Sequence, residues 1–228
     1  MTRQHGATET SPHTIIVVAG GGPPAPDAAR GLPADAYVIA ADSGIDHALA
    51  LGLHIDLAVG DMDSVTPAGL AAATAAGARI DRHPQAKDQT DLELALDQAL
   101  TLSPHPIVVL GNDGGRLDHL LAFALLLAHP RYAQVTIEAR LGQARLTVLH
   151  GPATATLHGT PGDIVTLLPL HGPAKGVTTE HLLYPLTSED LAPGTTRGVS
   201  NLLTAVATVH LRSGTLLAIQ PCRTERPA

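Results

Sequence analysis

Two closely spaced aspartates directly follow an apolar run, and they offer the most distinctive chemistry in the sequence. Leu57-Ala58-Val59 leads into Gly60-Asp61-Met62-Asp63-Ser64. In an extended segment, side chains two residues apart point to the same side. Carboxylates about 4 Å apart repel by roughly 4 kcal/mol at an effective dielectric near 20, which favours a shared proton, bulk water or a divalent cation between them. Mg²⁺ suits such oxygen ligands and often brings substrate phosphates with it. A solvated, Asp-rich turn is the alternative interpretation.

The composition indicates a soluble globular protein of one large domain or two modest ones. Of the 228 residues, 44% are hydrophobic and 15% charged, a balance that excludes a disordered chain. No apolar run approaches the roughly 20 residues that span a bilayer, and the polar segment Met1–Pro12 shows no signal sequence. The single cysteine, Cys222, cannot form an intramolecular disulfide, and the net charge of −7 argues against binding to nucleic acid. We therefore expect a cytoplasmic protein with neither a membrane nor a nucleic-acid partner.

The first part of the chain alternates strand and helix signals. Short, almost fully apolar runs predict parallel strands that are buried on both faces. Thr66-Pro67 predicts the cap and first turn of one helix, and Thr90 with Glu93 predicts a capping box at another. The sequence predicts strands at 14–19, 36–41, 57–59, 78–82 and 106–110, and helices at 44–51, 67–77, 91–102 and from about 117 to 128.

The polar residues of this region lie after strands, at the turns into helices. In an open parallel sheet these turns share the carboxyl edge, where ligands bind. The helix-to-strand returns, such as Ala76-Gly77-Ala78, carry no comparable chemistry. We therefore expect one crevice formed by Asp42, Asp61, Asp63, Lys87, Asp88, Asp91, Arg116 and Asp118.

Several of these residues also have a purely structural interpretation. Lys87 among carboxylates could form a simple surface ion pair, and Thr90 is expected to cap a helix in any case. Asp91 at a first helical position is favoured by the helix dipole alone. The stretch Gly111–Gly115 is typical of a loop that cradles phosphate, yet it is neither a Walker sequence nor a Rossmann fingerprint.

After about Gly142 the pattern changes to short segments rich in Val, Leu and Thr, separated by Gly and Pro turns. This pattern is typical of an antiparallel β-sandwich. The fold class predicted is thus an N-terminal three-layer, Rossmann-like α/β domain at 14–142 followed by a C-terminal antiparallel β-sandwich at 143–220. Residues 1–13 and 221–228 are expected to be tails. The β segments are predicted at 143–150, 153–158, 163–168, 175–180, 204–212 and 215–220.

The motifs occur in the order and spacing of the thiamine pyrophosphokinase family, which the chain resembles from about Ile15 to Ile219. Joint occurrence makes the resemblance far more specific than any single motif. It rests on Ala41-Asp42-Ser43-Gly44, Gly60-Asp61-Met62-Asp63-Ser64, Lys87-Asp88-Gln89-Thr90-Asp91-Leu92-Glu93, Gly114-Gly115-Arg116-Leu117-Asp118-His119, Gly162-Asp163-Ile164-Val165-Thr166-Leu167, Tyr184-Pro185-Leu186 and Gly198-Val199-Ser200-Asn201.

The resemblance implies an ATP- and Mg²⁺-dependent transfer of a pyrophosphoryl group to thiamine, giving thiamine diphosphate and AMP. It implies a homodimer with the active site at the subunit interface. By the same resemblance Asp61, Asp63 and Asp91 hold Mg²⁺, while Asp42 and Asp118 line the reacting end. Lys87, Asp88, Thr90, Gly114, Gly115 and Arg116 serve ATP and its phosphates, and Ser200 and Asn201 face thiamine.

The chain departs from the family pattern at a few positions. Ser43 stands where many relatives have a second glycine, and Asp46 where they have asparagine. His181 and Leu183 replace a more usual glycine and lysine, and there is no tryptophan. Three other functions remain alternatives: a related Mg²⁺-dependent phosphotransferase or nucleotide hydrolase, a non-catalytic thiamine- or nucleotide-binding regulator, and a purely structural α/β protein.

Overall fold

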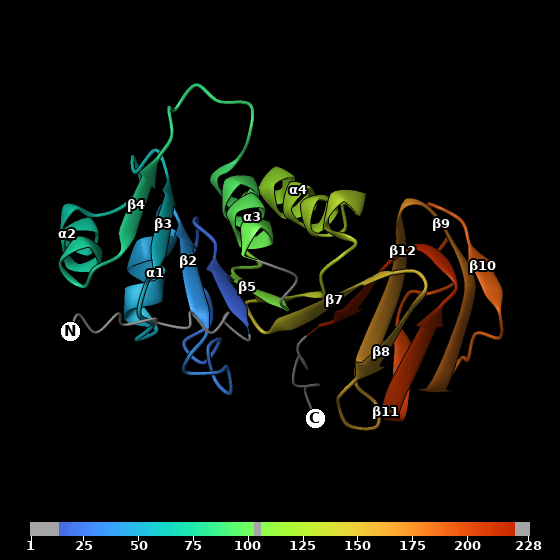
Figure 1. Cartoon of the computed structure of the whole chain (residues 1–228). Coiled ribbons are helices and arrows are strands. Elements are labelled where there is room, and N and C mark those ends of the chain that lie inside the picture. The colour runs from blue at the N-terminus through green and yellow to red at the C-terminus, as the bar shows by residue number, and fades with distance from the viewer. Residues whose placement is uncertain (1–13, 103–105, 222–228) are drawn as a thin grey trace, which may run out of the picture.

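A parallel sheet with helices on both faces forms the first part of the chain (Figure 1). The computed structural model describes residues 14–102 and 106–221, so Met1–Pro12 and Cys222 lie outside the described residues. The parallel strands follow the order β4-β3-β2-β1-β5-β6. Their bounds are β1 Ile15–Val18, β2 Tyr37–Ala41, β3 Leu57–Gly60, β4 Arg79–Arg82, β5 Ile107–Gly111 and β6 Ile137–Leu141; the helices are α1 Gly44–Ala50, α2 Pro67–Ala75, α3 Asp91–Thr101, α4 Leu117–Leu127 and the 3-10 turn η1 Pro130–Tyr132.

Alternate residues of each parallel strand point into two separate cores, as the pleat of a strand requires. Ile15 and Val17 belong to the core that includes residues of α3 and α4. Ile16 and Val18 belong to the opposite core, beneath α1 and α2. Continuous apolar runs are therefore needed in these strands, and the predicted three-layer arrangement is confirmed.

One strand of this sheet, β6, is absent from the sequence prediction. It pairs in parallel with β5. Its residues alternate, with Ile137, Ala139 and Leu141 buried and the two between them partly exposed. A half-buried strand of this kind lacks the continuous apolar run that identifies the others, because only one of its faces is fully covered.

The sheet continues without interruption into the second part of the chain. β7 pairs antiparallel with β6 and with β12, and β12 pairs antiparallel with β9. A second layer contains β8, β11, β10 and the later part of β9. The bounds are β7 Ala144–His150, β8 Ala153–Leu157, β9 Ile164–Leu182, β10 Glu189–Leu191, β11 Asn201–Leu211 and β12 Ser213–Gln220. The predicted antiparallel β region is confirmed.

The long strand β9 joins the two layers of this β region. The sequence predicts two strands here, at 163–168 and 175–180, but the structure has one bent strand of 19 residues. Left-handed backbone angles at His171, Gly172 and Gly176 (φ 56°, 137° and 64°) turn the chain without ending the pairing. Its first part pairs with β12 and, at Ile164 and Val165, with the start of β11. Its later part pairs with β10 and with the rest of β11, and one buried apolar core lies between the layers.

Within the described residues, none of the helices has the length and apolar character that crossing a bilayer requires.

Candidate active site

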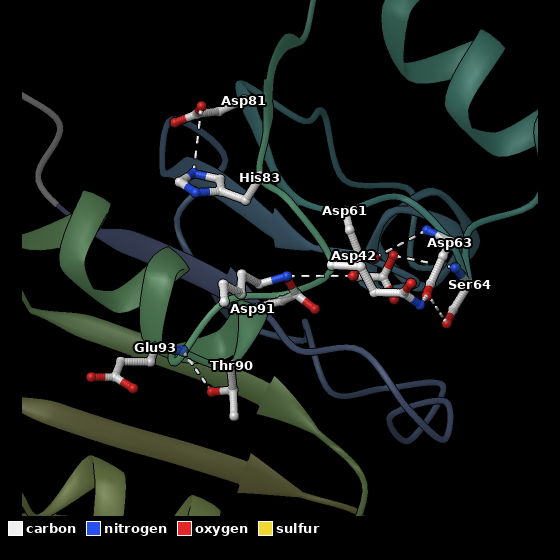
Figure 2. A network of polar contacts seen from close by, with 11 residues as sticks. Asp42, Asp61, Asp63, Ser64, Asp81, His83, Thr90, Asp91 and Glu93 are labelled. Carbon is white, nitrogen blue, oxygen red and sulfur yellow. Dashed lines mark hydrogen bonds and ion pairs between the residues drawn. The ribbon is translucent and has the colours of Figure 1, made fainter.

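Three aspartates from different elements meet at the carboxyl edge of the parallel sheet (Figure 2). Asp42 follows β2, Asp61 follows β3, and Asp91 is the first residue of α3. One carboxylate oxygen of each lies within 4.8 Å of those of the other two. β2 and β3 pair in parallel, so both strands end at the same edge. The result is a set of hard oxygen atoms of the kind that Mg²⁺ prefers.

The backbone at the two strand ends allows this close approach. Asp42 and Met62 have φ angles of 48° and 65°, and Gly60 has φ of 142°. A Cβ atom on Gly60 would lie 3.0 Å from Asp91 Oδ1 and 3.2 Å from Asp42 Cβ. Glycine is therefore required both for the backbone angle and for the space between the acids. Met62, only 8% exposed, packs into the core beneath α1 and α2 and anchors the loop.

The electrostatics of the cluster are those of acids held close together. At 4.8 Å, each ionised pair repels by roughly 3–4 kcal/mol at an effective dielectric near 20. Burial, with the charge of Asp91 adding to it, raises the pKa of Asp42. Asp61 differs, because a hydrogen bond from the Asp63 backbone amide, together with Lys87, lowers its pKa. A cation among the three carboxylates would relieve this repulsion.

Lys87 lies across two of the three acids. Its ammonium nitrogen is 2.9 Å from Asp91 Oδ1 and 3.4 Å from Asp61 Oδ2. Burial alone would lower the pKa of Lys87, but its bonds to Asp91 and Asp61 outweigh this effect and raise the pKa. Asp91 Oδ1 is buried and accepts no well-directed hydrogen bond, so its contact with Lys87 is an ion pair. The segment that carries Lys87 joins β4 to α3 and projects beyond the sheet (Figure 1).

Asp63, a metal ligand by the family resemblance, is not part of the group of three. Its carboxylate accepts hydrogen bonds from the Ser64 hydroxyl at 2.8 Å and from Gln85 Nε2 at 2.7 Å. Asp42 lies in the cluster instead, because β2 ends beside β3 while the turn at Met62 directs Asp63 toward solvent. The ligand role of Asp63 stays a prediction.

Thr90 performs the capping role that the sequence predicts. Its hydroxyl accepts a hydrogen bond from the backbone amide of Glu93 at 3.2 Å (Figure 2). Glu93 does not complete a capping box, because its carboxylate forms an ion pair with Arg131 at 2.8 Å. Asp88 is exposed on the same segment. The cap fixes the start of α3 and thereby the position of Asp91.

The loop after β5 also reaches this edge of the sheet. Gly115 has φ of 92°, and the Gly114 amide donates a hydrogen bond to Asn112 Oδ1 at 2.6 Å. Arg116 and Asp118 pair with each other at 2.6 Å, with side chains 71% and 64% exposed. The Arg116 guanidinium lowers the pKa of Asp118. The structure thus leaves Asp118 outside the group of three acids.

Three further residues organise the site, and no role was predicted for them from the sequence. Gln85 binds Asp63, as described above. Asn112 Nδ2 donates to the carbonyl of Pro23 at 2.7 Å and so ties the β5–α4 loop to the Gly20–Gly22 turn. His47, which lies on α1, has its Nε2 2.9 Å from the carbonyl oxygen of Gly21. All three lie in or beside the Gly- and Asp-rich turns, and this position in the sequence could have identified them as residues of the site.

The predicted thiamine contacts lie in the β region. Ser200 has φ of 56°, and its amide donates to Thr166 Oγ1 at 3.1 Å. Asn201 is 3% exposed, and its side-chain amide accepts from the Tyr184 amide at 3.0 Å and donates to the Tyr184 carbonyl at 2.7 Å. Asn201 therefore holds the backbone of Tyr184, whose own side chain is 58% exposed.

Comparisons with known proteins match both parts of the chain. The family described as "Thiamin pyrophosphokinase, catalytic domain" matches residues 30–139, and "Thiamin pyrophosphokinase, vitamin B1 binding domain" matches residues 154–216. The thiamine pyrophosphokinase of Bacillus subtilis (strain 168) is 29% identical over 219 residues, covering 91% of this chain and 98% of that protein.

Solved structures agree over nearly the whole length. The crystal structure of the Bacillus subtilis thiamine pyrophosphokinase has a TM-score of 0.78 and 28% identity, covering 91% of this chain and 98% of that one. The thiamin pyrophosphokinase of Geobacillus thermodenitrificans has a TM-score of 0.77 and 30% identity, covering 92% and 99%. With the acidic cluster at the carboxyl edge and the β region in place, the chain belongs to the thiamin pyrophosphokinase family and is an enzyme that transfers the pyrophosphoryl group of ATP to thiamine.

Proposed function

We propose that this transfer takes place at the acidic cluster, with Mg²⁺ held by Asp61 and Asp91 and by Asp42 as a third ligand. The observation that carries the proposal is the approach of three carboxylates from β2, β3 and α3 to within 4.8 Å. Asp63 would join the ligands after release from Gln85. A bound Mg²⁺ supplies charge neutralisation on the phosphate oxygens as they react.

The phosphate contacts that we propose come from two loops at the same sheet edge. Lys87 lies beside the acids on one loop, and Arg116 stands at the start of α4 on the other, next to Gly114 and Gly115. The Arg116–Asp118 pair is exposed, and water screens exposed ion pairs strongly, so a phosphate can displace it at little cost. Asp88 and Thr90 lie on the loop that carries Lys87 and would help to hold the shape of that loop. Thr90 does so by capping α3.

In the reaction, the hydroxyethyl oxygen of thiamine forms a bond to the β-phosphorus of ATP. The bond from that phosphorus to the oxygen bridging the α- and β-phosphates breaks, and its electron pair leaves with AMP. The thiamine hydroxyl loses its proton to a base or to solvent. Lys87 and Arg116 would orient the triphosphate, since positioning and charge stabilisation dominate phosphoryl transfer.

The test is product analysis with purified protein, ATP, Mg²⁺ and thiamine. Phosphorus NMR should show AMP and thiamine diphosphate in equal amounts, and a chelator should abolish both products. ADP with thiamine monophosphate would indicate a kinase that transfers the γ-phosphoryl group, and ADP with free phosphate a hydrolase. Either outcome would overturn the proposed chemistry of the cluster.

We further propose a homodimer in which thiamine is bound by one subunit and the acids come from the other. From β2 to β9 the sheet order contains six strand-to-strand steps. At about 4.8 Å each, these steps separate the acids from Ser200 and Asn201 by roughly 29 Å along the sheet. Figure 1 likewise shows the β region at the opposite end of the sheet from β2 and β3. One chain by itself therefore does not bring thiamine to the acids.

Exposed apolar side chains support the dimer. Such side chains on one helix face are typical of a protein interface. Tyr184 and Val199 adjoin the predicted thiamine contacts and belong to the same set of exposed large residues. The set comprises Leu117, Leu121 and Leu125 along α4, and Ile164, Leu183, Tyr184, Val199 and Val206 in the β region.

Mixing two inactive variants tests the shared site. Asp61→Asn damages the acids, and Ser200→Arg blocks the thiamine side. Refolded together, they should regain about a quarter of wild-type activity, because random assembly gives half mixed dimers with one intact site each. A monomer in light scattering, or no recovery in mixed dimers, would contradict the shared site.

The domain division and the compartment complete the proposal. A boundary near residue 142 is supported by the two separate family matches at 30–139 and 154–216. The sheet nevertheless runs through this boundary, from β6 to β7. A cytoplasmic location is supported by the use of ATP and by the single cysteine in the sequence.

A further inference from the structure

The contact between Lys87 and the acids leads to an inference about the order of events at the site. Lys87 Nζ lies 2.9 Å from Asp91 Oδ1 and 3.4 Å from Asp61 Oδ2. These are two of the three carboxylates proposed to hold Mg²⁺. A Mg²⁺ ion binds carboxylate oxygens at about 2.1 Å. An ammonium and a divalent ion bound to the same oxygens would repel each other strongly.

Because the site is buried, the Lys87 ammonium and a Mg²⁺ ion cannot occupy it at the same time. Almost no surface of Asp91 Oδ1 is exposed, and no other donor reaches it. The Lys87 side chain is itself only 13% exposed between the two acids. The oxygen therefore has room for one positive partner at a time.

The segment that carries Lys87 covers a further acid in the same way. Gln85, two residues earlier, donates from Nε2 to Asp63 Oδ2 at 2.7 Å. Pro84, Gln85, Ala86 and Asp88 are exposed, so the segment is held at the site largely by these polar contacts. Lys87 has a flexible four-carbon stem, so its ammonium can leave the acids without unfolding the segment.

We propose that Lys87 is a placeholder cation: its ammonium occupies the divalent-cation site between Asp61 and Asp91, and it moves onto the triphosphate when Mg²⁺ and ATP enter together. The proposal rests on the Mg²⁺ site proposed above. Free metal has to displace Lys87, whereas metal with nucleotide gives the ammonium a new anionic partner. The enzyme thereby binds free divalent cation weakly and Mg²⁺ with ATP strongly, with Lys87 coupling the two.

Direct measurement of metal binding tests this role without reference to activity. Mn²⁺ is titrated into each protein without nucleotide and followed by electron paramagnetic resonance. Lys87→Met should bind Mn²⁺ about tenfold more tightly than the wild type, within the 5–150-fold range usual for coupled sites. Lys87→Arg, which keeps the charge, should stay near the wild type. Lys175→Met is the matched control, because Lys175 is the other lysine of the chain and lies exposed on β9.

A second titration measures the coupling. With a non-hydrolysable ATP analogue present, the wild type should gain more Mn²⁺ affinity than Lys87→Met, because only the wild type has a lysine to release. A melting curve in chelator and in Mg²⁺ provides the folding control, and the Mg²⁺-induced rise should be larger in Lys87→Met.

The possible results distinguish a failure of the role proposed for Lys87 from a failure of the proposed Mg²⁺ site. If Asp61→Asn loses Mn²⁺ binding while Lys87→Met binds no more tightly than the wild type, the metal site stands and the placeholder role is wrong. If Asp61→Asn binds Mn²⁺ as the wild type does, the metal site is wrong and the placeholder role is wrong with it.

Discussion

Gly60 offers a sharp test of how the backbone forms the acidic cluster. The residue joins β3 to Asp61 with φ of 142°, in a region that only glycine adopts readily. In Gly60→Ala, the new Cβ would lie 3.0 Å from Asp91 Oδ1 and 3.2 Å from Asp42 Cβ. Ordinary contacts between carbon atoms are about 3.5–4.0 Å. Both acids would therefore have to move by a few tenths of an ångström, away from the added Cβ.

The expected loss has two parts. A non-glycine residue held at such an angle costs about 1–3 kcal/mol, and the tight contacts bring the total to about 2–4 kcal/mol. For a chain of this size, 1 kcal/mol lowers the melting temperature by about 2–4 °C. Thermal unfolding followed by circular dichroism should therefore show a fall of roughly 5–15 °C. Mn²⁺ affinity should fall more than about tenfold, because ligand spacing changes directly.

Gly77→Ala is the matched control for the backbone effect. Gly77 also has a positive φ, of 96°, but a Cβ there would have no neighbour within 4 Å. We expect this variant to lose about 1 kcal/mol and no Mn²⁺ affinity. Equal melting temperatures and equal Mn²⁺ affinities in the two variants would refute the packing argument for Gly60.

Three further predictions follow from the same structure. Asp61→Asn should reduce turnover at least about a hundredfold, measured as AMP release, because one carboxylate of the cluster proposed to hold Mg²⁺ is lost; near-normal turnover at low Mg²⁺ would contradict it. Asn201→Ala should lower the free energy of unfolding by about 2–3 kcal/mol in urea, because the Tyr184 amide and carbonyl lose their partners, and calorimetry should show weaker thiamine binding with unchanged ATP binding. Burial lowers the pKa of His150 from 6.5, so the unfolded chain binds the proton more readily and stability is lost as the pH falls below about 6.5. His150→Gln should flatten this fall in melting temperature, and an unchanged pH profile would show that another group is responsible.

Much of the fold could be read from the sequence because local signals and tertiary environment agree. The apolar runs of β1, β2, β3 and β5 indicate strands covered on both faces, and the helices α1 to α4 lie where turn and cap residues predict. β6 was missed because its alternating burial resembles many surface segments. The two strands predicted within β9 are one, because left-handed angles at His171 and Gly172 bend the chain while pairing with β12, β10 and β11 continues. Pairing across a bend depends on partners far away in the chain, which no local pattern contains.

The sequence by itself determined that Asp42, Asp61 and Asp91 belong to one edge, because parallel strands all end there. Only the tertiary structure decided which acids meet. The φ angles at Gly60 and Met62 set the direction of each carboxylate, so that Asp42 joins the cluster while Asp63 binds Ser64 and Gln85. Likewise, only the structure shows that Lys87 contacts Asp61 and Asp91 while Arg116 pairs with Asp118. Strand order fixes the position of a residue to within a few ångströms, but the contact that its side chain makes depends on backbone angles and loop packing that spacing along the chain does not specify.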